Sequence, residues 1–520
     1  MINTWTRTAA GLASGGTRRL SAGVAVGLAG AFVMALAACK DSTVPNFRSP
    51  QINPSTPSGI QYLSAGVVAS TRADIGQDIL TLSAFSREVG VFTTTDSRFI
   101  TEWMGDGNII PNADFYGGGG WSNEFRDAKD AQFIIRELPI VSPAYSASDV
   151  SLITGIMKTL EAYNMLLVAE TRDTNGVPIF GFDTAASSPA PILCIKDVWK
   201  GIAAMLDTAE ADLDAGKPGA LPIALPAGYA AVSAAGPSGT VGTFAGFNRA
   251  LAAYAKLQYA YGVTRSPGGT PATATTPGSP LASALTAADS AIHATFLYAP
   301  AALTPPTAGN FTDPLAVYHS FSSTSGDVDN PVTFAVGQTT TVFVLDTVAD
   351  EIAAGGDKRA LKLIVNSAAP NSEAGPIANA LASKAMTLGA YQSASSPVPI
   401  IRNEELVLIE AQIQLGLGNL AGAVASINAV RTNVGGVAVY AGPMTYVAVR
   451  DQLLHELRAS NIGEPGGERI MATRNYGLQK ALTTTWDPIP SDTTDTHATV
   501  LPIPIQESGP RNGNIATSCP

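Results

Sequence analysis

The sequence predicts a mainly α-helical protein, built as a solenoid of helical hairpins with long irregular loops and a few short strands. Two observations support this fold class. Apolar residues recur at helical spacing in pairs of segments at about 155–215, 246–295 and 402–435. The stretches between these pairs are rich in Gly, Pro, Ser and Thr, which is typical of irregular structure.

The clearest hairpin occupies residues 397–437. Each of its helices carries apolar residues on one face: Leu406, Ile409, Ile413 and Leu417 in the first, and Leu420, Ala423, Val424 and Ile427 in the second. Asn419 can cap the second helix, and Gly435-Gly436 is expected to end it. The repeat length is near the roughly 34 residues of a tetratricopeptide unit. We therefore expect a tetratricopeptide-like arrangement.

Other helices are expected where the same periodicity appears. They are 58–88 with a break near Gly76, 121–138, 148–170 with Ser148 or Asp149 as N-cap, 197–213, 247–262, 281–293 and 446–460. A short strand is expected at 339–346, inside an irregular segment that spans 296–396. Two further irregular segments are expected at about 92–121 and 216–245.

Residues 1–38 have the pattern of an export signal. Basic residues precede an apolar run, Leu20 to Ala38, which ends in Leu36-Ala37-Ala38-Cys39. The alternative is a transmembrane anchor, because the run approaches spanning length. A cysteine directly after small residues favours a lipoprotein signal, with Cys39 as the lipidated residue. Residues 39–58, which contain four prolines, are then the tether.

Composition excludes some functions. The net charge of −11 and the pI near 4.9 argue against nucleic-acid binding. The three cysteines show no metal-site spacing, so neither a metal nor a cofactor is expected. Cys194 and Cys519 can pair in an oxidising compartment or remain free thiols, and the sequence leaves both alternatives open.

The segment 92–121 is the first candidate for ligand contacts. It combines four consecutive glycines with aromatic, Asp and Asn residues, and long loops in compact domains tend to be functional. Aromatic rings can stack on sugar rings, and Asp and Asn can bind hydroxyl groups. The candidate residues are Trp103, Asp106, Asn108, Phe115, Tyr116 and Trp121. The alternative is that Trp103 and Trp121 fill the core. The second candidate segment is 296–396, with Tyr298, Tyr318, Phe321 and Tyr391.

The hairpin at 397–437 also resembles a known family in its residue types. Pro-x-x-Arg-x-x-Glu-x-x-Leu-x-x-Ala, a Gly-rich turn, and Ala-x-x-x-Ile-Asn-x-Val-Arg resemble the C-terminal signature of the SusD/RagB family. The matching residues are Arg402, Glu405, Leu408, Ala411, Gly418, Ala423, Ile427, Asn428, Val430 and Arg431. Asn403-Glu404 departs from the usual pattern. The tail, Leu501-Pro502-Ile503-Pro504, resembles the family's ending.

The resemblance implies roles for several residues. Arg402, Glu405, Asn428 and Arg431 are expected to be structural. A helix with Glu456-Leu457, followed by Gly467, Arg469 and Arg474, is similar to a further family step, although Ile470 and Ala472 replace its usual aromatic and Asp. Here we expect Arg469 or Arg474 to pair with Glu456 rather than to bind a ligand.

The family resemblance also implies a function. Residues 59–520 would form one SusD-like domain, anchored by lipid to the outer membrane and exposed at the cell surface. It would bind an oligosaccharide or a peptide without catalysis and deliver it to a SusC-like TonB-dependent transporter. The sequence does not name the ligand.

Two alternatives come from other classes of protein. One is a secreted glycoside hydrolase, which needs two positioned carboxylates. Asp106 and Asp114 are available, but no pattern selects a pair. The other is a peptide-binding scaffold that uses a tetratricopeptide-like groove. His455-Glu456-Leu457 lacks the second histidine of a zinc protease, because position 459 is Ala459.

Overall fold

The structure is a computed structural model of the full chain. It describes residues 56–93, 96, 98–104, 110–112, 119–141, 144–179, 189–264, 279–324, 326–333, 341–366, 381–465, 468–479, 498–511 and 513. Residues Pro54–Pro520 form one compact unit. The predicted signal, Cys39 and most of the predicted tether lie outside the described residues.

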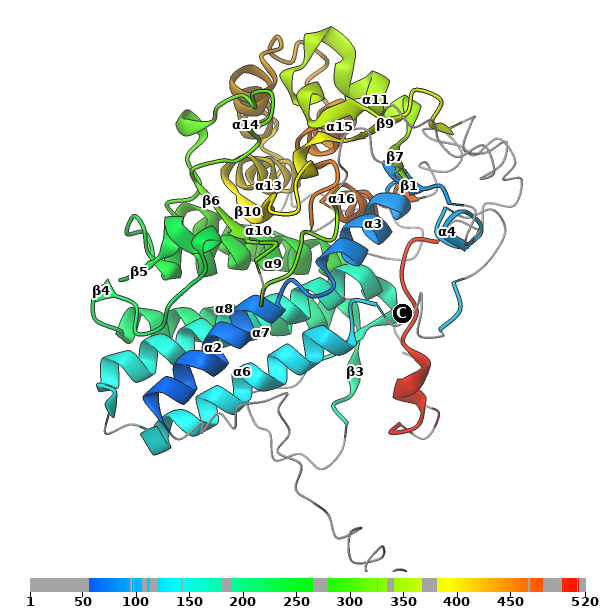
Figure 1. The fold of residues 1–520 in the computed structure, drawn as a ribbon. Coiled ribbons are helices and arrows are strands. Elements are labelled where there is room, and N and C mark those ends of the chain that lie inside the picture. The colour runs from blue at the N-terminus through cyan, green and yellow to red at the C-terminus, as the bar shows by residue number, and fades with distance from the viewer. Residues whose placement is uncertain are drawn as a thin grey trace, which may run out of the picture. The chain divides into compact units, whose positions relative to one another are not determined.

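Long helices form the body of this unit, and most of them pack against the next helix along the chain (Figure 1). They are α2 Pro57–Ser70, α3 Ile75–Phe85, α6 Ser122–Val141, α7 Ala147–Arg172, α8 Ile195–Ala215, α9 Phe244–Thr264, α10 Pro280–His293, α13 Asn403–Gly416, α14 Leu420–Val430, α15 Tyr446–Asn461 and α16 Glu468–Asn475. Successive packing of α6 on α7, α7 on α8, α8 on α9, α9 on α10 and α13 on α14 confirms the predicted helical-hairpin architecture.

Short elements connect these helices. Helices α4 Arg98–Thr101 and α11 Asp346–Ala353 are the smaller helices. The strands form two-stranded antiparallel sheets: β1 Val89–Val91 with β7 Val342–Val344, β2 Val177–Pro178 with β3 Ile192–Leu193, β4 Gly219–Ala220 with β5 Ala234–Ala235, β6 Ala316–His319 with β10 Val398–Arg402, and β8 Leu363–Val365 with β9 Met386–Leu388. Strand β7 lies inside the segment 339–346, where a strand was expected.

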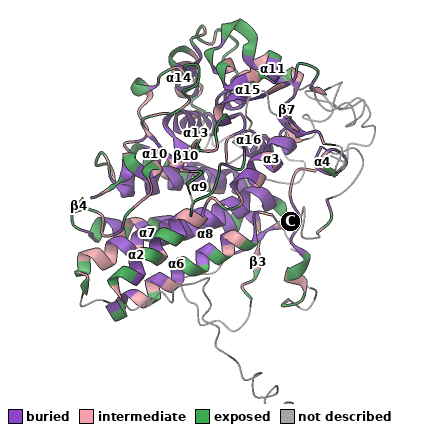
Figure 2. Ribbon diagram, viewed as in Figure 1, coloured by how far each residue is buried: buried purple, intermediate pink, exposed green. Residues whose placement is uncertain are grey.

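The core lies along the buried faces of α7 and α13, which are purple for most of their length in Figure 2. Among the described residues, one helix, Ala147–Asn175, is long and apolar enough to cross a membrane by length and composition. Within that helix, 89% of the most apolar window is buried inside the fold, so it packs as a core helix.

Helix ends follow local capping chemistry. Asn419 accepts a hydrogen bond from the Gly422 amide at 3.1 Å, which confirms its predicted cap. Helix α7 begins one residue earlier than expected, at Ala147. Ser146 is its N-cap, and Asp149 completes a capping box with it, so the prediction that Ser148 or Asp149 is the N-cap is wrong. Two hydroxyl residues so close together can both cap, and the side chain of Asp149 selects Ser146 by bonding back to its amide at 3.0 Å.

A buried cluster of charges joins α15 to the segments around it. Glu456, which is fully buried, forms ion pairs with Arg359 and with Arg431, each at 2.6 Å. Both carboxylate oxygens of Asp357 accept hydrogen bonds from the same Arg359 guanidinium. Asn428 accepts a hydrogen bond from the Tyr440 amide at 2.6 Å. The structural roles expected for Arg431 and Asn428 are thus visible as contacts.

The expected pairing of Glu456 with Arg469 or Arg474 is wrong. Helix α16 packs on α15 as well as on α3 and α9, but its two arginines point to acidic residues just after α3 and α7 instead of to Glu456. Arg469 lies 3.9 Å from Glu88, which follows α3. Arg474 donates to the Glu170 carbonyl at 2.6 Å and lies 3.8 Å from Asp173, at the end of α7.

The C-terminal segment 498–511 is hydrogen-bonded to residues of the N-terminal half of the unit. Its Leu501 amide donates to the Thr171 carbonyl at 2.7 Å, and its Ile505 amide donates to the Asn112 carbonyl at 2.8 Å. Residues 501–504 are extended, as the two prolines predict, and lie against the end of α7. Cys194, at the start of α8, is disulfide-bonded, and its partner lies outside the described residues.

Candidate functional site

The two tryptophans predicted to bind ligand, Trp103 and Trp121, are both buried, and 3% of the surface of each residue is exposed to solvent. Trp103 packs edge-on against Phe99, with ring centroids 4.9 Å apart. Trp121 packs in the same way against Phe125 at 4.9 Å, and its indole nitrogen donates to Glu507 at 3.1 Å. Burial and these contacts favour the packing role that the sequence left open. Asp106, Asn108, Phe115 and Tyr116 lie outside the described residues, so their ligand role stays a prediction.

The segment 296–396 lines two cavities instead. The larger has a volume of about 380 Å³ and lies between α2, the turn Ala227–Val232 and the residues that follow β6. We call it the α2 cavity. Its volume is within the range of small-molecule sites, roughly 300–1,000 Å³. Its polar and aromatic lining includes Arg72, His319, Ser320, Phe321 and Asp327.

Local chain geometry brings these residues together. Arg72 follows the C-terminal end of α2, and its guanidinium lies 5.1 Å from the centre of the Phe321 ring. The same guanidinium forms an ion pair with Asp327. The turn before α9 approaches β6 so closely that a Cβ on Gly228 would lie 2.0 Å from the Tyr318 carbonyl oxygen. Gly228 therefore permits this wall, and its amide donates to Ser320 at 2.7 Å.

The charges of the α2 cavity are fixed near neutral pH. Burial, together with a smaller effect of the positive charge of Arg72, lowers the pKa of His319 to about 3. This neutral imidazole meets the Tyr163 hydroxyl at 3.0 Å. The backbone amide of Val328 and then Arg72 lower the pKa of Asp327. The cavity thus offers one guanidinium, one carboxylate and an apolar ring, a combination that can hydrogen-bond hydroxyl groups and cover an apolar ring face.

This arrangement does not supply acid–base chemistry for glycoside cleavage. That reaction normally uses two carboxylates on either side of the bond. Among the described residues that line the α2 cavity, Asp327 is the single carboxylate, and it is held by Arg72. His319 is buried, and its Nε2 atom is hydrogen-bonded to the Tyr163 hydroxyl. The site therefore suits binding.

The second cavity, of about 290 Å³, has a floor of paired charges. Arg402 forms ion pairs with Glu404 and, at 2.7 Å, with Glu464. Burial acts to raise the pKa of Glu404, but Arg402, Lys362 and Arg359 outweigh it and lower that pKa to about 2. These charges neutralise one another, so we assign the residues of the cavity floor a structural role. The rim carries Phe311, beside polar side chains.

Glu405, the remaining residue expected to be structural, is also buried. It lines a void of about 20 Å³ with Tyr163 and Glu170, which has room for about one water molecule.

Sequence reasoning missed most of the α2 cavity. Phe321 was among the aromatics of the second candidate segment, but Arg72, His319 and Asp327 carry no local signal. They come from two segments that are more than two hundred residues apart in the chain.

Comparison of the sequence with protein-family models finds no match, and comparison with curated proteins finds none either. Solved structures are similar in fold. A SusD superfamily protein from Bacteroides thetaiotaomicron aligns with a TM-score of 0.61 at 14% identity, over 88% of this chain and 98% of that one. A SusD-like carbohydrate binding protein from Bacteroides vulgatus aligns with a TM-score of 0.55 at 13% identity, over 81% and 83%.

A third structure, described as a laminarin binding SusD-like protein, aligns with a TM-score of 0.52 at 18% identity, over 86% of this chain and 97% of that one. Each of these alignments extends over more than four fifths of both chains. The chain therefore has the fold of the SusD superfamily proteins.

Proposed function

We propose that this protein is a non-catalytic lipoprotein of the outer membrane, which captures glycans and delivers them to a TonB-dependent transporter. Three findings support the proposal: the resemblance of the hairpin residues, the shared fold, and neighbours in that fold that are described as carbohydrate or laminarin binding. The observation that carries it is the α2 cavity, where Arg72, Asp327 and Phe321 meet in a space large enough for a sugar residue.

Calorimetry with a panel of oligosaccharides, laminarin fragments included, tests the binding step. We expect saturable binding to the parent. Asp327→Asn and Arg72→Ala are each expected to weaken it at least about tenfold, or about 1.4 kcal/mol, because charged hydrogen bonds to hydroxyls are lost. Arg450→Ala is the matched control, because Arg450 pairs with its neighbour Asp451 on α15 and does not line the cavity.

The outcomes separate the candidates. Parent-like affinity in both cavity variants would refute the α2 cavity as the site. Binding of peptides but no glycan would favour the scaffold alternative, and release of reducing sugars from an oligosaccharide would favour the hydrolase. Trp121→Ala is expected to lower stability without selectively lowering affinity, because the indole is buried.

The membrane and transporter steps need their own test. Cys39→Ser is expected to move the protein from the membrane fraction to the soluble fraction and to abolish metabolic lipid labelling. Co-purification of a TonB-dependent transporter with the parent is the expected sign of the partner. Retention of the Cys39→Ser variant in the membrane would contradict lipid anchoring at this residue.

A further inference from the structure

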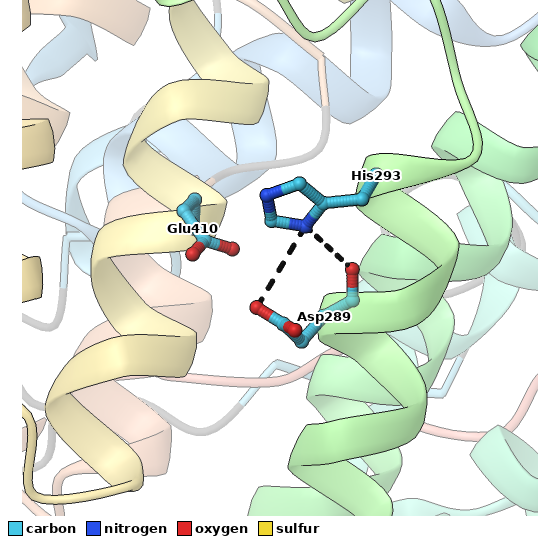
Figure 3. A group of neighbouring side chains, drawn as sticks. All are labelled: Asp289, His293 and Glu410. Carbon is cyan, nitrogen blue, oxygen red and sulfur yellow. Dashed lines mark hydrogen bonds and ion pairs between the residues drawn. The ribbon is translucent and has the colours of Figure 1, made fainter. Parts of the chain in front are cut away.

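Three side chains that can bind a metal meet between α10 and α13, outside both cavities described above. Asp289 and His293 are one helical turn apart on α10, and Glu410 faces them from α13 (Figure 3). Each offers one ligand atom, and these atoms lie within 4.8 Å of one another. Sequence reasoning expected no metal, because the three cysteines show no metal-site spacing, and it did not single out these three residues.

Glu410 is the buried member of this group. Only 5% of it is exposed, and its Oε2 atom is buried without a hydrogen-bond partner. Among the described residues, no lysine or arginine forms an ion pair with Glu410 or Asp289. A buried carboxylate beside a second carboxylate therefore lacks a compensating cation.

The histidine is oriented with a free ring nitrogen. Its Nδ1 atom lies 2.9 Å from the Asp289 backbone carbonyl, which can only accept, so Nδ1 carries the proton. Nε2 then keeps its lone pair, and Figure 3 shows this nitrogen on the side of the ring nearer Glu410. Nδ1 is the nitrogen that lies 3.8 Å from the Asp289 carboxylate, so the Asp289 side chain must move toward Nε2 when an ion binds. A backbone carbonyl that fixes the tautomer in this way is the usual support of a metal-binding histidine.

Hydrogen bonds from Gln414 position the carboxylates of Glu410 and Asp289. The Gln414 amide nitrogen donates to Glu410 at 2.6 Å and to Asp289 at 3.1 Å. Its amide oxygen accepts from Asn419 at 2.8 Å. Because Asn419 uses its own oxygen to cap α14, the orientation of both amides is determined, and Gln414 must present its nitrogen to the acidic pair.

We propose that Asp289, His293 and Glu410 form a binding site for a divalent transition-metal ion, with Zn²⁺ the best match. One imidazole and two carboxylates, with an open side toward solvent, suit Zn²⁺ held by three protein ligands and water. His293 is 55% exposed and Asp289 34%, so an ion can enter and both side chains can close on it. Ligand atoms around tetrahedral Zn²⁺ lie about 3.4 Å apart, which requires closure by about an ångström.

The site would act as a clamp. His293 is the last residue of α10, just before the irregular segment 296–396, and Glu410 is on the helix that follows that segment. A shared ion joins the two helices where the insertion leaves and re-enters the helical body. This inference is independent of glycan binding and can fail or succeed separately.

Calorimetric titration of the full chain, produced without a histidine tag, with ZnCl₂ tests the site. We expect one Zn²⁺ per chain and a rise in the melting temperature on binding. His293→Gln and Glu410→Gln are each expected to weaken binding at least about tenfold, and Gln414→Ala by about 10- to 100-fold, because it positions the ligands. His293→Gln alters an exposed side chain, so it is informative even where Glu410→Gln fails to fold.

His455→Gln is the matched control, because His455 also lies beside a carboxylate, Glu351, at 2.8 Å. It should leave Zn²⁺ affinity unchanged. Absence of saturable Zn²⁺ binding would overturn the proposal, as would an equal loss of affinity in His455→Gln and His293→Gln. Tighter binding of Ca²⁺ or Mg²⁺ than of Zn²⁺ would overturn the transition-metal assignment.

Discussion

The helical pairs and the segment 296–396 are stabilised in different ways. Helices α9 and α10 pack against each other and are rich in buried alanine, whose small side chain lets neighbouring helices approach closely. The buried alanines are Ala250, Ala252, Ala253, Ala255 and Ala260 in α9, and Ala282, Ala284, Ala288 and Ala291 in α10. The segment 296–396 has short strands and turns instead. It is tied to the body by individual polar side chains such as Arg359, which bonds to Asp357, Glu456 and Ser460.

The helical pairs and the insertion 296–396 therefore differ in what specifies their structure. A helical pair is specified by periodic apolar residues close together in sequence. The insertion depends on a few buried charges whose partners are distant, and it supplies lining to both cavities. The lining of the two cavities can therefore vary while the helical body keeps its form, provided that the buried ion pairs are kept.

The largest effect is expected at the charge cluster that anchors the insertion. Glu456→Ala leaves Arg359 and Arg431 without their shared partner inside the protein. We expect a loss of about 3–5 kcal/mol in the free energy of unfolding, because an uncompensated buried charge is costly. Urea denaturation followed by circular dichroism measures it.

The control for that variant is an exposed ion pair. Asp350 and Lys384 pair at the surface, with 68% and 43% of their side chains exposed. Asp350→Ala should cost less than about 1 kcal/mol. Equal losses in the two variants would contradict the view that buried charges, rather than ion pairs in general, hold the insertion.

A smaller effect is expected inside the helical body. Burial raises the pKa of Glu161 on α7 from 4.5 to about 8. Below pH 4.5 the group is protonated in both the folded and the unfolded state. Between pH 4.5 and 8 the unfolded chain ionises first, so this group's contribution to stability falls as pH rises.

Glu161→Gln removes this titration while keeping an amide near Gln132, which donates to Glu161 at 2.7 Å. Relative to the parent, the variant should gain about 3.5 kcal/mol in the free energy of unfolding between pH 5 and pH 8. Denaturant titrations of both proteins at the two pH values measure the gain. A difference that stays constant with pH would show that the folded carboxyl titrates normally.

The smallest effect is expected at a helix end. Ser146→Ala removes the N-cap of α7 and should cost about 1 kcal/mol. Thr208→Ala removes a hydroxyl in the middle of α8, where it only bonds to the Ala204 carbonyl, and should change stability by less than about 0.5 kcal/mol. Thermal melts of the two variants compare them. A larger loss in Thr208→Ala would reverse the ranking.

Sequence reasoning succeeded where structure is local. The hairpin α13–α14, its Asn419 cap and the helices from α6 to α10 follow from apolar spacing and turn chemistry. It failed where contacts are long-range. Glu456 meets Arg359, about a hundred residues earlier, and neither of the two arginines expected on α16. The α2 cavity depends on how the end of α2 meets the residues after β6, and no single stretch of sequence encodes that meeting.

The segment 498–511 has a consequence for how the chain reaches its final form. Its backbone bonds to Thr171 and Asn112, and its Glu507 receives the indole of Trp121. Helices made early in synthesis therefore lack these bonds at their ends until residues 498–511 have been synthesised. A chain that stops before residue 498 would leave those ends open to proteases.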